Sequence, residues 1–215
     1  MIESFKKIDF SATPCDFNFK LILIGHTGVG KTNILTKFCD NQFSENFQIT
    51  IGVEYKTQIV EINDKKVELR IWDTAGQERY QSMTKLYYRS SNGVFIVYDI
   101  TNPESFNKLD YWIKELKSQE QANAMFMIIG NKCDLEDKRK ISKEKGEKFA
   151  KENDVLFMET SAKDGTNIEE AFEVLTKEIL SVSQKKNNLT NSIILSGPNQ
   201  NQNPNSNRKT KSGCC

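Results

Sequence analysis

The chain has 215 residues and a formal net charge of +1, from 30 Lys and Arg against 29 Asp and Glu. This length suits one well-packed domain with a tail, and the near-zero charge excludes an overall field that would draw the protein to nucleic acid or membrane. Five cysteines without paired spacing and a single histidine argue against a disulfide framework and a His-rich zinc site, and they favour a reducing compartment.

Short apolar runs alternate with segments of helical periodicity, after a short extension over residues 1–16. Runs typical of strands buried on both faces occupy residues 21–24, 94–98, 125–129 and 155–158. Two further runs flank a polar turn and predict a β-hairpin over residues 56–62 and 67–72. Helical spacing is clear over residues 106–116 and 168–179. No run approaches the roughly 18 apolar residues of a membrane span, and the first residues do not predict a secretory signal.

This alternation predicts a single α/β domain over residues 17–182. We expect about six strands in a mostly parallel sheet, with one antiparallel edge strand and helices on both faces. Ligands bind at the carboxyl ends of strands in such sheets. After about residue 182 the pattern stops, and residues 183–215, rich in Asn, Ser, Lys, Gln and Pro, predict a disordered tail.

The segment after the first strand matches the phosphate-loop pattern G-x4-G-K-[ST] without departure, in residues Gly25, His26, Thr27, Gly28, Val29, Gly30, Lys31 and Thr32. Its glycines let backbone N–H groups face phosphates, and the helix that follows adds its positive dipole. Lys31 would neutralise the β- and γ-phosphates, and the Thr32 hydroxyl would bind Mg²⁺. We include the next residue, Asn33, among the nucleotide contacts. An ordinary Gly-rich turn is the alternative, and the flanking strand and helix argue against it.

Asp73-Thr74-Ala75-Gly76-Gln77 follows the second strand of the predicted hairpin. A carboxylate at a strand end beside a phosphate loop fits a magnesium partner that acts through water, so we assign Asp73 to the metal. Gly76 allows its own N–H to approach a γ-phosphate, and Gln77 can turn a water in line for attack. Alone, Gln77 would be a solvated loop residue. Beside the other motifs it is the predicted catalytic residue.

Thr50 lies in a polar loop between the first helix and the hairpin, and taken alone it would be a surface threonine. With the other motifs present we predict it as the second magnesium ligand and a contact to the γ-phosphate. Because that contact can exist only in the triphosphate state, loss of the phosphate would release the loop and make a switch.

Asn131-Lys132-Cys133-Asp134 follows an apolar strand and predicts guanine as the base. Guanine presents N1–H and a 2-amino group side by side, and the carboxylate of Asp134 can accept both hydrogen bonds. Adenine lacks this pair of donors and would leave a buried carboxylate unsatisfied. Ser161-Ala162-Lys163, weak alone, follows the last predicted strand, so the Ala162 N–H can donate to guanine O6. All these loops are expected to meet at one edge of the sheet.

Five further segments, at residues 51–55, 68–72, 79–84, 87–89 and 96–101, resemble the signature segments of the Rab family within the Ras superfamily of small GTPases. The resemblance covers about residues 17–182 and the last two residues. It implies a P-loop GTPase domain with Mg²⁺, a GTP/GDP switch whose slow hydrolysis depends on an activator, and recruitment of effectors to membranes in vesicle trafficking. Phe43 stands where the family places an aromatic ring over guanine. An aromatic triad read by effectors is implied for Tyr55, Trp72 and Tyr87, for which packing within the fold is the bland alternative.

The final Cys214-Cys215 is similar to the Rab ending that carries two geranylgeranyl chains. One lipid chain gives marginal attachment and two give a stable anchor, so the pair predicts lipidation rather than two free thiols. Arg208, Lys209 and Lys211 would add attraction to an anionic leaflet. The resemblance implies as partners an exchange factor, a GTPase-activating protein, prenylation machinery, a dissociation inhibitor and effectors, and no nucleic acid. It places the protein on the cytoplasmic face of intracellular membranes, cycling with the cytosol.

Several positions depart from the family pattern, among them Ser90-Ser91-Asn92, which replaces the usual small Gly-Ala pair after Tyr-Tyr-Arg. His26 occupies a loop position that is usually small or acidic, Phe47 stands where many relatives have tyrosine, and Thr27 where relatives vary. Two alternatives stay open: Thr27 and Phe47 allow an effector-binding module that holds GTP with little turnover, and a phosphate loop alone allows a kinase or ATPase. Asp134 argues against the second.

Overall fold

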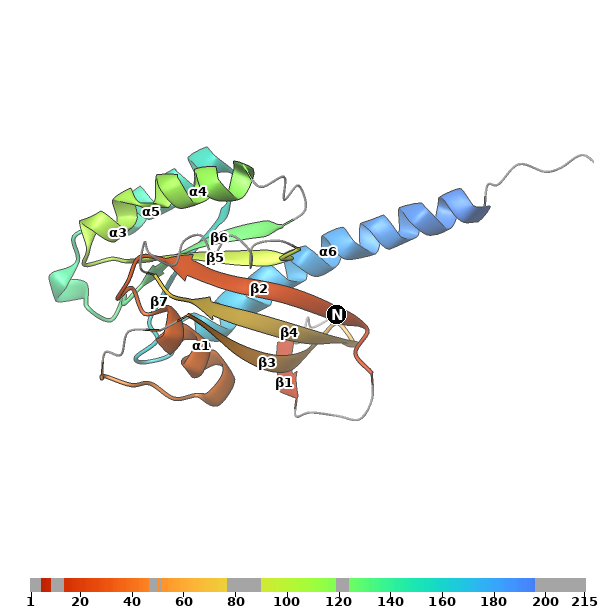
Figure 1. Cartoon of the computed structure of the whole chain (residues 1–215), viewed down its shortest axis with the longest axis horizontal. Coiled ribbons are helices and arrows are strands. Elements are labelled where there is room, and N and C mark those ends of the chain that lie inside the picture. Colours follow the sequence, from red (N-terminus) through yellow and green to blue (C-terminus); the bar gives the residue numbers. More distant parts are fainter. Residues whose placement is uncertain are drawn as a thin grey trace, which may run out of the picture. The chain divides into compact units, whose positions relative to one another are not determined.

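The computed structural model describes residues 5–8, 14–46, 50, 52–76, 90–118 and 124–195. Strands and helices alternate along this part of the chain (Figure 1). In order, the elements are β1 (Phe5–Ile8), β2 (Phe17–Gly25), α1 (Lys31–Asp40), β3 (Val53–Ile62), β4 (Lys65–Thr74), β5 (Gly93–Asp99), α3 (Pro103–Asn107), α4 (Leu109–Ser118), β6 (Met125–Asn131), the 3-10 turn η2 (Glu136–Lys138), α5 (Lys143–Asn153), β7 (Leu156–Thr160) and α6 (Ile168–Leu195).

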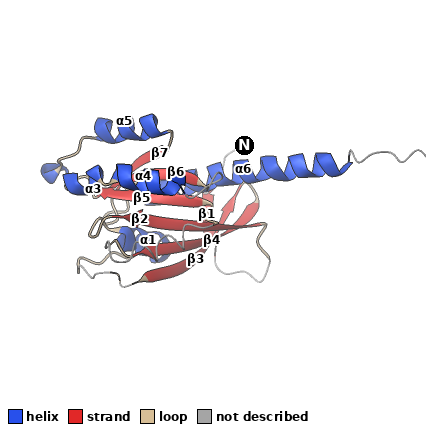
Figure 2. Cartoon of the chain, turned by 45° about the horizontal axis from the view of Figure 1, so that its top comes forward, coloured by secondary structure: helices blue, strands red, loops and turns tan. Residues whose placement is uncertain are grey.

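The strands of the described residues form one sheet in the order β1-β3-β4-β2-β5-β6-β7 (Figure 2). Strand β2 lies parallel to both β4 and β5, and β5, β6 and β7 continue the parallel part. The predicted hairpin is the antiparallel pair β3 and β4. The prediction of an α/β fold with a mostly parallel sheet is therefore confirmed.

The sheet differs from the prediction at its edge. Over the described residues it has seven strands, and a second antiparallel pair, β1 with β3, lies beyond the predicted pair of β3 with β4. The additional strand, β1, lies in the predicted N-terminal extension and pairs antiparallel with the far end of β3. Its sequence is only four residues long and contains two lysines, so it carries no period-2 signal. Tertiary contacts hold it: Lys7 Nζ lies 2.5 Å from a carboxylate oxygen of Glu169 in α6 and 4.7 Å from the centre of the Phe38 ring in α1.

Helices cover both faces of the sheet, as expected. Helices α1 and α6 pack on one face, where Phe172 stacks on Phe38 at 3.7 Å between ring centres and meets Phe95 of β5 edge-on. Helices α3, α4 and α5 lie together on the other face (Figure 1). Strand β5 is buried at every residue because both of its faces are covered. This core holds the carboxyl ends of the parallel strands at one edge.

Helix α6 continues to Leu195, whereas the sequence predicted a tail from residue 183. Residues 183–195 contain neither Gly nor Pro and include good helix formers, so nothing in them ends the helix. Gly197 and Pro198, the first strong stop signals, come just after it. By internal contacts the chain divides into residues 1–181 and 182–215. The domain limits at residues 17 and 182 stay a prediction, and residues 196–215 lie outside the described part. None of the described helices combines the length and apolar content that a membrane span needs.

Candidate nucleotide-binding site

A cavity of about 500 Å³ is bounded by the loops that follow β2, β4, β6 and β7, by α1, and by the segment after α1. This volume is in the range of small-molecule sites. Most of the predicted nucleotide contacts line it: Thr27, Gly28, Gly30, Lys31, Thr32, Asn33, Phe43, Thr50, Gly76, Asn131, Lys132, Asp134, Ala162 and Lys163. The predicted convergence of the loops is therefore observed.

Five predicted residues lie behind this lining and contact it. They are Gly25, His26, Val29, Asp73 and Ser161. Four other predicted residues lie outside the described part of the chain: the catalytic Gln77, Tyr87, Cys214 and Cys215. Phe47 lies outside it as well.

Gly30, the last glycine of the phosphate loop, stands where a side chain would be strained and crowded. Gly30 precedes α1 with φ +94°, in the left-handed region, and a Cβ there would lie 2.5 Å from Asn131 Nδ2. The first turn of α1 then begins at the cavity with backbone N–H groups that lack helical partners. This arrangement favours an anion.

Lys31 is buried, and its Nζ donates to the carbonyl oxygens of Gly25 at 2.9 Å and His26 at 3.0 Å. Burial lowers the pKa of this amine to about 8, although Asp73 opposes the shift. A phosphate in the cavity would supply the negative charge that favours the protonated amine.

Three oxygen-bearing side chains from separate segments meet beside Lys31. The Thr32 hydroxyl donates to Asp73 Oδ2 at 2.5 Å and lies 2.8 Å from the Thr50 hydroxyl. The other carboxylate oxygen of Asp73, Oδ1, is buried without a hydrogen-bond partner among the described residues. Burial raises the pKa of Asp73 to about 6, and Lys31 opposes that shift. Mg²⁺ prefers hard oxygen ligands such as carboxylates, hydroxyls and phosphates. The Asp73 carboxylate and the two threonine hydroxyls therefore fit that cation.

Gly76 brings the segment after β4 against the phosphate loop. A Cβ on Gly76 would lie 2.6 Å from the backbone nitrogen of Thr27 and 2.7 Å from the Gly25 carbonyl oxygen, so a side chain would force the two loops apart. The residue that follows Gly76 in the chain is Gln77. The approach of Gly76 to the phosphates, predicted from its lack of a side chain, agrees with this contact.

Asn131 and Lys132 tie the base loop to the phosphate loop. Asn131 Nδ2 donates to the Val29 carbonyl oxygen at 2.8 Å. Lys132 Nζ donates to the Gly28 carbonyl oxygen at 2.8 Å and pairs with Asp99 at 2.7 Å. The contacts to Val29 and Gly28 each join residues about a hundred positions apart in the sequence. The motif therefore builds the site as well as lining it.

Asp134 lines the cavity and is held by the loop after β7. The Ser161 hydroxyl donates to Asp134 Oδ1 at 2.7 Å and accepts from the backbone N–H of Lys163 at 3.2 Å. Thr160 Oγ1 donates to Asn131 Oδ1 at 3.2 Å, a second link between the same loops. Ser161 is thus a residue that orients Asp134 rather than a lining residue.

Sequence reasoning missed several lining residues: Thr36, Ser44, Glu45, Asn46 and Leu135. Position gives a signal for two of them, because Thr36 is one helical turn after Thr32 and Leu135 follows Asp134. The others lie in the loop after α1, which matches no motif. That loop is held by Asn33, whose Nδ2 donates to the Ser44 carbonyl oxygen at 3.1 Å.

Comparison with known proteins agrees with this geometry. A sequence model of the Ras family matches residues 20–181. The chain is 46% identical over 183 residues to Ras-related protein Rab-8B of Homo sapiens. The aligned region covers 85% of this chain and 88% of that protein. It is 47% identical over 171 residues to Ras-related protein Rab-8A of Mus musculus, covering 80% and 83%. The chain belongs to the Rab family of small GTPases, within the Ras family.

As a Rab GTPase the chain is a GTP/GDP switch that hydrolyses GTP to GDP in vesicle trafficking. The predicted family and enzyme class are confirmed. No contact among the described residues favours the alternative of a module that holds GTP with little turnover.

In this Rab GTPase two members of the predicted aromatic triad lie side by side. Tyr55 of β3 and Trp72 of β4 are paired in register, with ring centres 4.7 Å apart. Tyr55 is 46% exposed, which leaves its ring available to a partner. The pair therefore packs on itself and also presents an aromatic surface, so the two readings made from sequence are compatible.

Proposed function

We propose that the cavity holds GTP or GDP with Mg²⁺, the phosphates against the phosphate loop and the base against Asp134. The observation that carries this proposal is the cluster of Thr32, Thr50 and Asp73 beside the buried amine of Lys31. A lysine amine can bind the phosphates, and the hard oxygen ligands beside it can bind the divalent metal of the same triphosphate.

Hydrolysis is proposed to depend on Gln77, which would hold the attacking water in line with the γ-phosphate. Its neighbour Gly76 lies against the phosphate loop, which supports that placement. Mg²⁺ bound at the oxygen cluster would neutralise charge on the phosphate oxygens. Loss of the γ-phosphate would remove its contact to Thr50 and release the loop before β3, which gives the switch its two states.

The base is proposed to lie between the loops after β6 and β7. The Asp134 carboxylate would accept the N1–H and 2-amino hydrogen bonds of guanine, and the Ala162 N–H would donate to O6. The ring of Phe43, which lines the cavity at 37% exposure, would cover one face of the base. Adenine does not match the hydrogen bonds to Asp134 and Ala162, whereas it could stack on Phe43 as guanine does.

The tail is proposed to anchor the protein by geranylgeranyl chains on Cys214 and Cys215. The protein would then reside on the cytoplasmic face of intracellular membranes and return to the cytosol with a dissociation inhibitor. An exchange factor and a GTPase-activating protein would set the state of the switch. Effectors would read the GTP state through Tyr55, Trp72 and Tyr87.

A single-turnover assay on the full chain tests the enzymatic proposal. GTP-loaded protein is started with Mg²⁺, with and without an activator, for the natural sequence and for Gln77→Leu. We expect the substitution to slow hydrolysis by roughly tenfold or more and to leave GTP and GDP affinity nearly unchanged. Gln58→Leu on β3 is the matched control. Equal rates for Gln77→Leu and the natural sequence would contradict the role of Gln77.

A further inference from the structure

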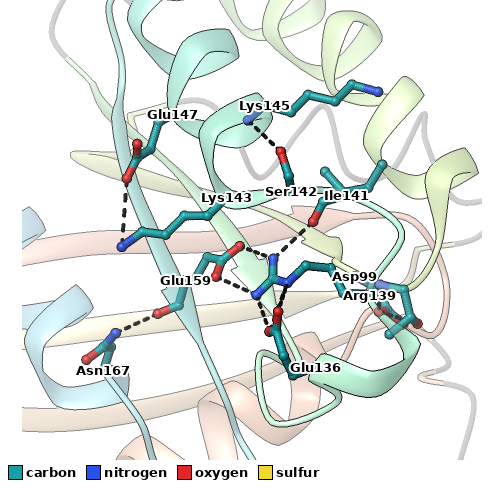
Figure 3. Close-up of polar contacts among 11 residues, drawn as sticks. Asp99, Glu136, Arg139, Ile141, Ser142, Lys143, Lys145, Glu147, Glu159 and Asn167 are labelled. Carbon is teal, nitrogen blue, oxygen red and sulfur yellow. Dashed lines mark hydrogen bonds and ion pairs between the residues drawn. The ribbon is translucent and has the colours of Figure 1, made fainter.

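Arg139 joins its own segment of the chain to that of Glu159, and the two residues are 20 positions apart in the sequence (Figure 3). It follows η2, which continues the Asn131–Asp134 loop. Its Nη1 and Nη2 donate to the two carboxylate oxygens of Glu159 at 2.7 and 2.9 Å, a two-pronged pair. Because both prongs are used, the pair fixes orientation as well as distance.

The Arg139–Glu159 pair is shielded from water. The side chains are 16% and 9% exposed, whereas Glu136, the second carboxylate on the same guanidinium, is 68% exposed. Arg139 Nε lies 2.9 Å from both oxygens of Glu136, and Nη1 also donates to the Ile141 carbonyl oxygen at 3.0 Å. The two carboxylates raise the pKa of Arg139 above its ordinary value through these hydrogen bonds. All three nitrogens of the guanidinium group therefore donate hydrogen bonds.

Glu159 is fixed at its other end by the fold. It pairs in register with Gly130 of β6, where a Cβ would lie 3.2 Å from Glu159 Cγ. Its carbonyl oxygen accepts a hydrogen bond from Asn167 Nδ2 at 2.8 Å, at the far end of the Ser161 loop (Figure 3). Thus Glu159 is anchored to the strand on one side and to the start of α6 on the other.

The same two segments meet again on the cavity side. Ser161, two residues after Glu159, donates to Asp134. Arg139 stands five residues after Asp134. The two segments are therefore joined twice, by the ion pair between Arg139 and Glu159 and by the hydrogen bond from Ser161 to Asp134.

We propose that Arg139 and Glu159 form a positioning clamp that sets where Asp134 stands relative to the Ala162 N–H, and so sets how well the site recognises the 2-amino group of guanine. This inference rests on the proposed role of Asp134. Neither residue lines the cavity, and in this proposal both act through the loops that do.

A purely stabilising ion pair makes a different prediction, and nucleotide discrimination separates the two. GDP and inosine diphosphate (IDP) differ only in the 2-amino group, so the ratio of their affinities reports the Asp134 contact to that group. General loosening of the domain would weaken GDP and IDP equally and leave the ratio unchanged. A displaced Asp134 would weaken GDP more than IDP.

The experiment measures Kd for GDP and for IDP in Mg²⁺ buffer on the full chain, by competition with a fluorescent guanine nucleotide. The variants are Arg139→Lys, which keeps the charge but loses the fork, and Glu159→Gln, which keeps the shape but loses the charge. A single substitution removes the partner of a charged side chain that is largely shielded from water, and this can destabilise the protein. The double variant Arg139→Met/Glu159→Leu therefore gives an apolar replacement that can fold where a single variant does not.

We expect the natural sequence to prefer GDP by about tenfold or more, the effect of one hydrogen bond to a charged group. Each clamp variant should reduce that ratio by about threefold or more. Arg70→Lys is the control, because Arg70 makes a similar pair with Glu68 on β4 at 2.6 Å, 50% and 18% exposed and without a role in the cavity. It should keep the natural ratio.

Two results would overturn the clamp. An unchanged GDP/IDP ratio in all three variants, with both affinities falling together, would leave only a stabilising pair. Equal affinity for GDP and IDP in the natural sequence would remove the Asp134 contact itself and the clamp with it. The natural sequence alone shows this second failure, so it cannot be confused with the first.

Discussion

At the scale of single residues, burial explains why Asp73 and Lys31 suit a charged ligand. Both side chains are removed from water, and each has its charged form disfavoured by that burial, with only partial relief from the other. A magnesium–phosphate complex brings charge of both signs to this place and would relieve both groups. Asp73 Oδ1 is buried and has no hydrogen-bond partner among the residues that the structure describes, as expected of a site built for an additional ligand.

Asp73→Asn should separate binding that depends on Mg²⁺ from binding that does not. The amide keeps the volume of the carboxylate but loses its charge. We expect GTP and GDP to dissociate faster by roughly tenfold in Mg²⁺, with little change in EDTA. Nucleotide release measured in both buffers checks this, with Asp110→Asn on the exposed side of α4 as control. An equal effect in Mg²⁺ and in EDTA would contradict the metal assignment.

Glycine positions in the site can be tested as a matched pair. Gly30 and Gly52 both have positive φ, +94° and +81°. Among the described residues, a Cβ at Gly30 would collide with Asn131 Nδ2, whereas a Cβ at Gly52 would meet nothing. Gly52→Ala should destabilise the protein by about 1 kcal/mol from backbone strain. Gly30→Ala should cost about 1–2 kcal/mol more, because strain and collision add. Urea unfolding of the nucleotide-free proteins measures both, and equal losses would show that the contact to Asn131 is unimportant.

At the scale of elements, β1 changes the edge of the sheet. Without it, β3 would be an edge strand along its whole length on that side. With it, residues 59–62 of β3 are paired, and the half that carries Tyr55 lies beyond the β1 pairing. Lys7 then links β1 to α1 and α6 through Phe38 and Glu169. Strand pairing with β3 and the contact of Lys7 with the Phe38 ring therefore both hold β1 in place. The ion pair adds little, because Glu169 is largely exposed.

Deletion of residues 1–8 should lower stability without changing the nucleotide site. We expect a loss of about 1–2 kcal/mol, from the partly buried apolar side chains of β1 and its pairing. Thermal unfolding of the GDP-bound protein measures the change, and GDP affinity provides the comparison. The substitution Lys6→Ala, on an exposed side chain of the same strand, should have little effect. An unchanged unfolding temperature after deletion would mean that β1 adds nothing to the fold.

At the scale of the whole molecule, the chain combines a nearly neutral charge with a strongly local site. The net charge of +1 provides no general attraction to a membrane, and the described helices provide no span. Membrane residence therefore depends, in our proposal, on lipid added to two cysteines at the end of the chain. Two chains are needed, since a single one binds only marginally.

The anchor is tested by expressing the tagged chain in a eukaryotic cell. We expect mass spectrometry to find two geranylgeranyl additions, on Cys214 and Cys215, and microscopy to place the protein on internal membranes. Cys214→Ser/Cys215→Ser should move it to the cytosol, whereas Cys15→Ser should not. An unmodified natural chain, or a double variant still on membranes, would refute the lipid anchor.

The features that the sequence allowed us to predict are those that a few neighbouring residues encode. A phosphate loop, a strand-end Asp73 and an N-K-x-D segment each state their chemistry locally, and alternating strands and helices bring strand ends to one edge. The lining by Ser44 and the strand β1 carry no such local signal. Helix α6 was predicted too short because composition was taken as its end, although no residue before Gly197 stops a helix.

One physical reason explains why some features could be predicted from the sequence and others could not. Local motifs depend on backbone geometry and side-chain chemistry within a few residues, so they allowed the base, the phosphate contacts and the fold class to be predicted from the sequence. The ties that hold these motifs in place join distant segments: Asn131 to Val29, Lys132 to Asp99, and Arg139 to Glu159. Such pairs exist only after the sheet has brought its strands together, and only the tertiary structure decided them.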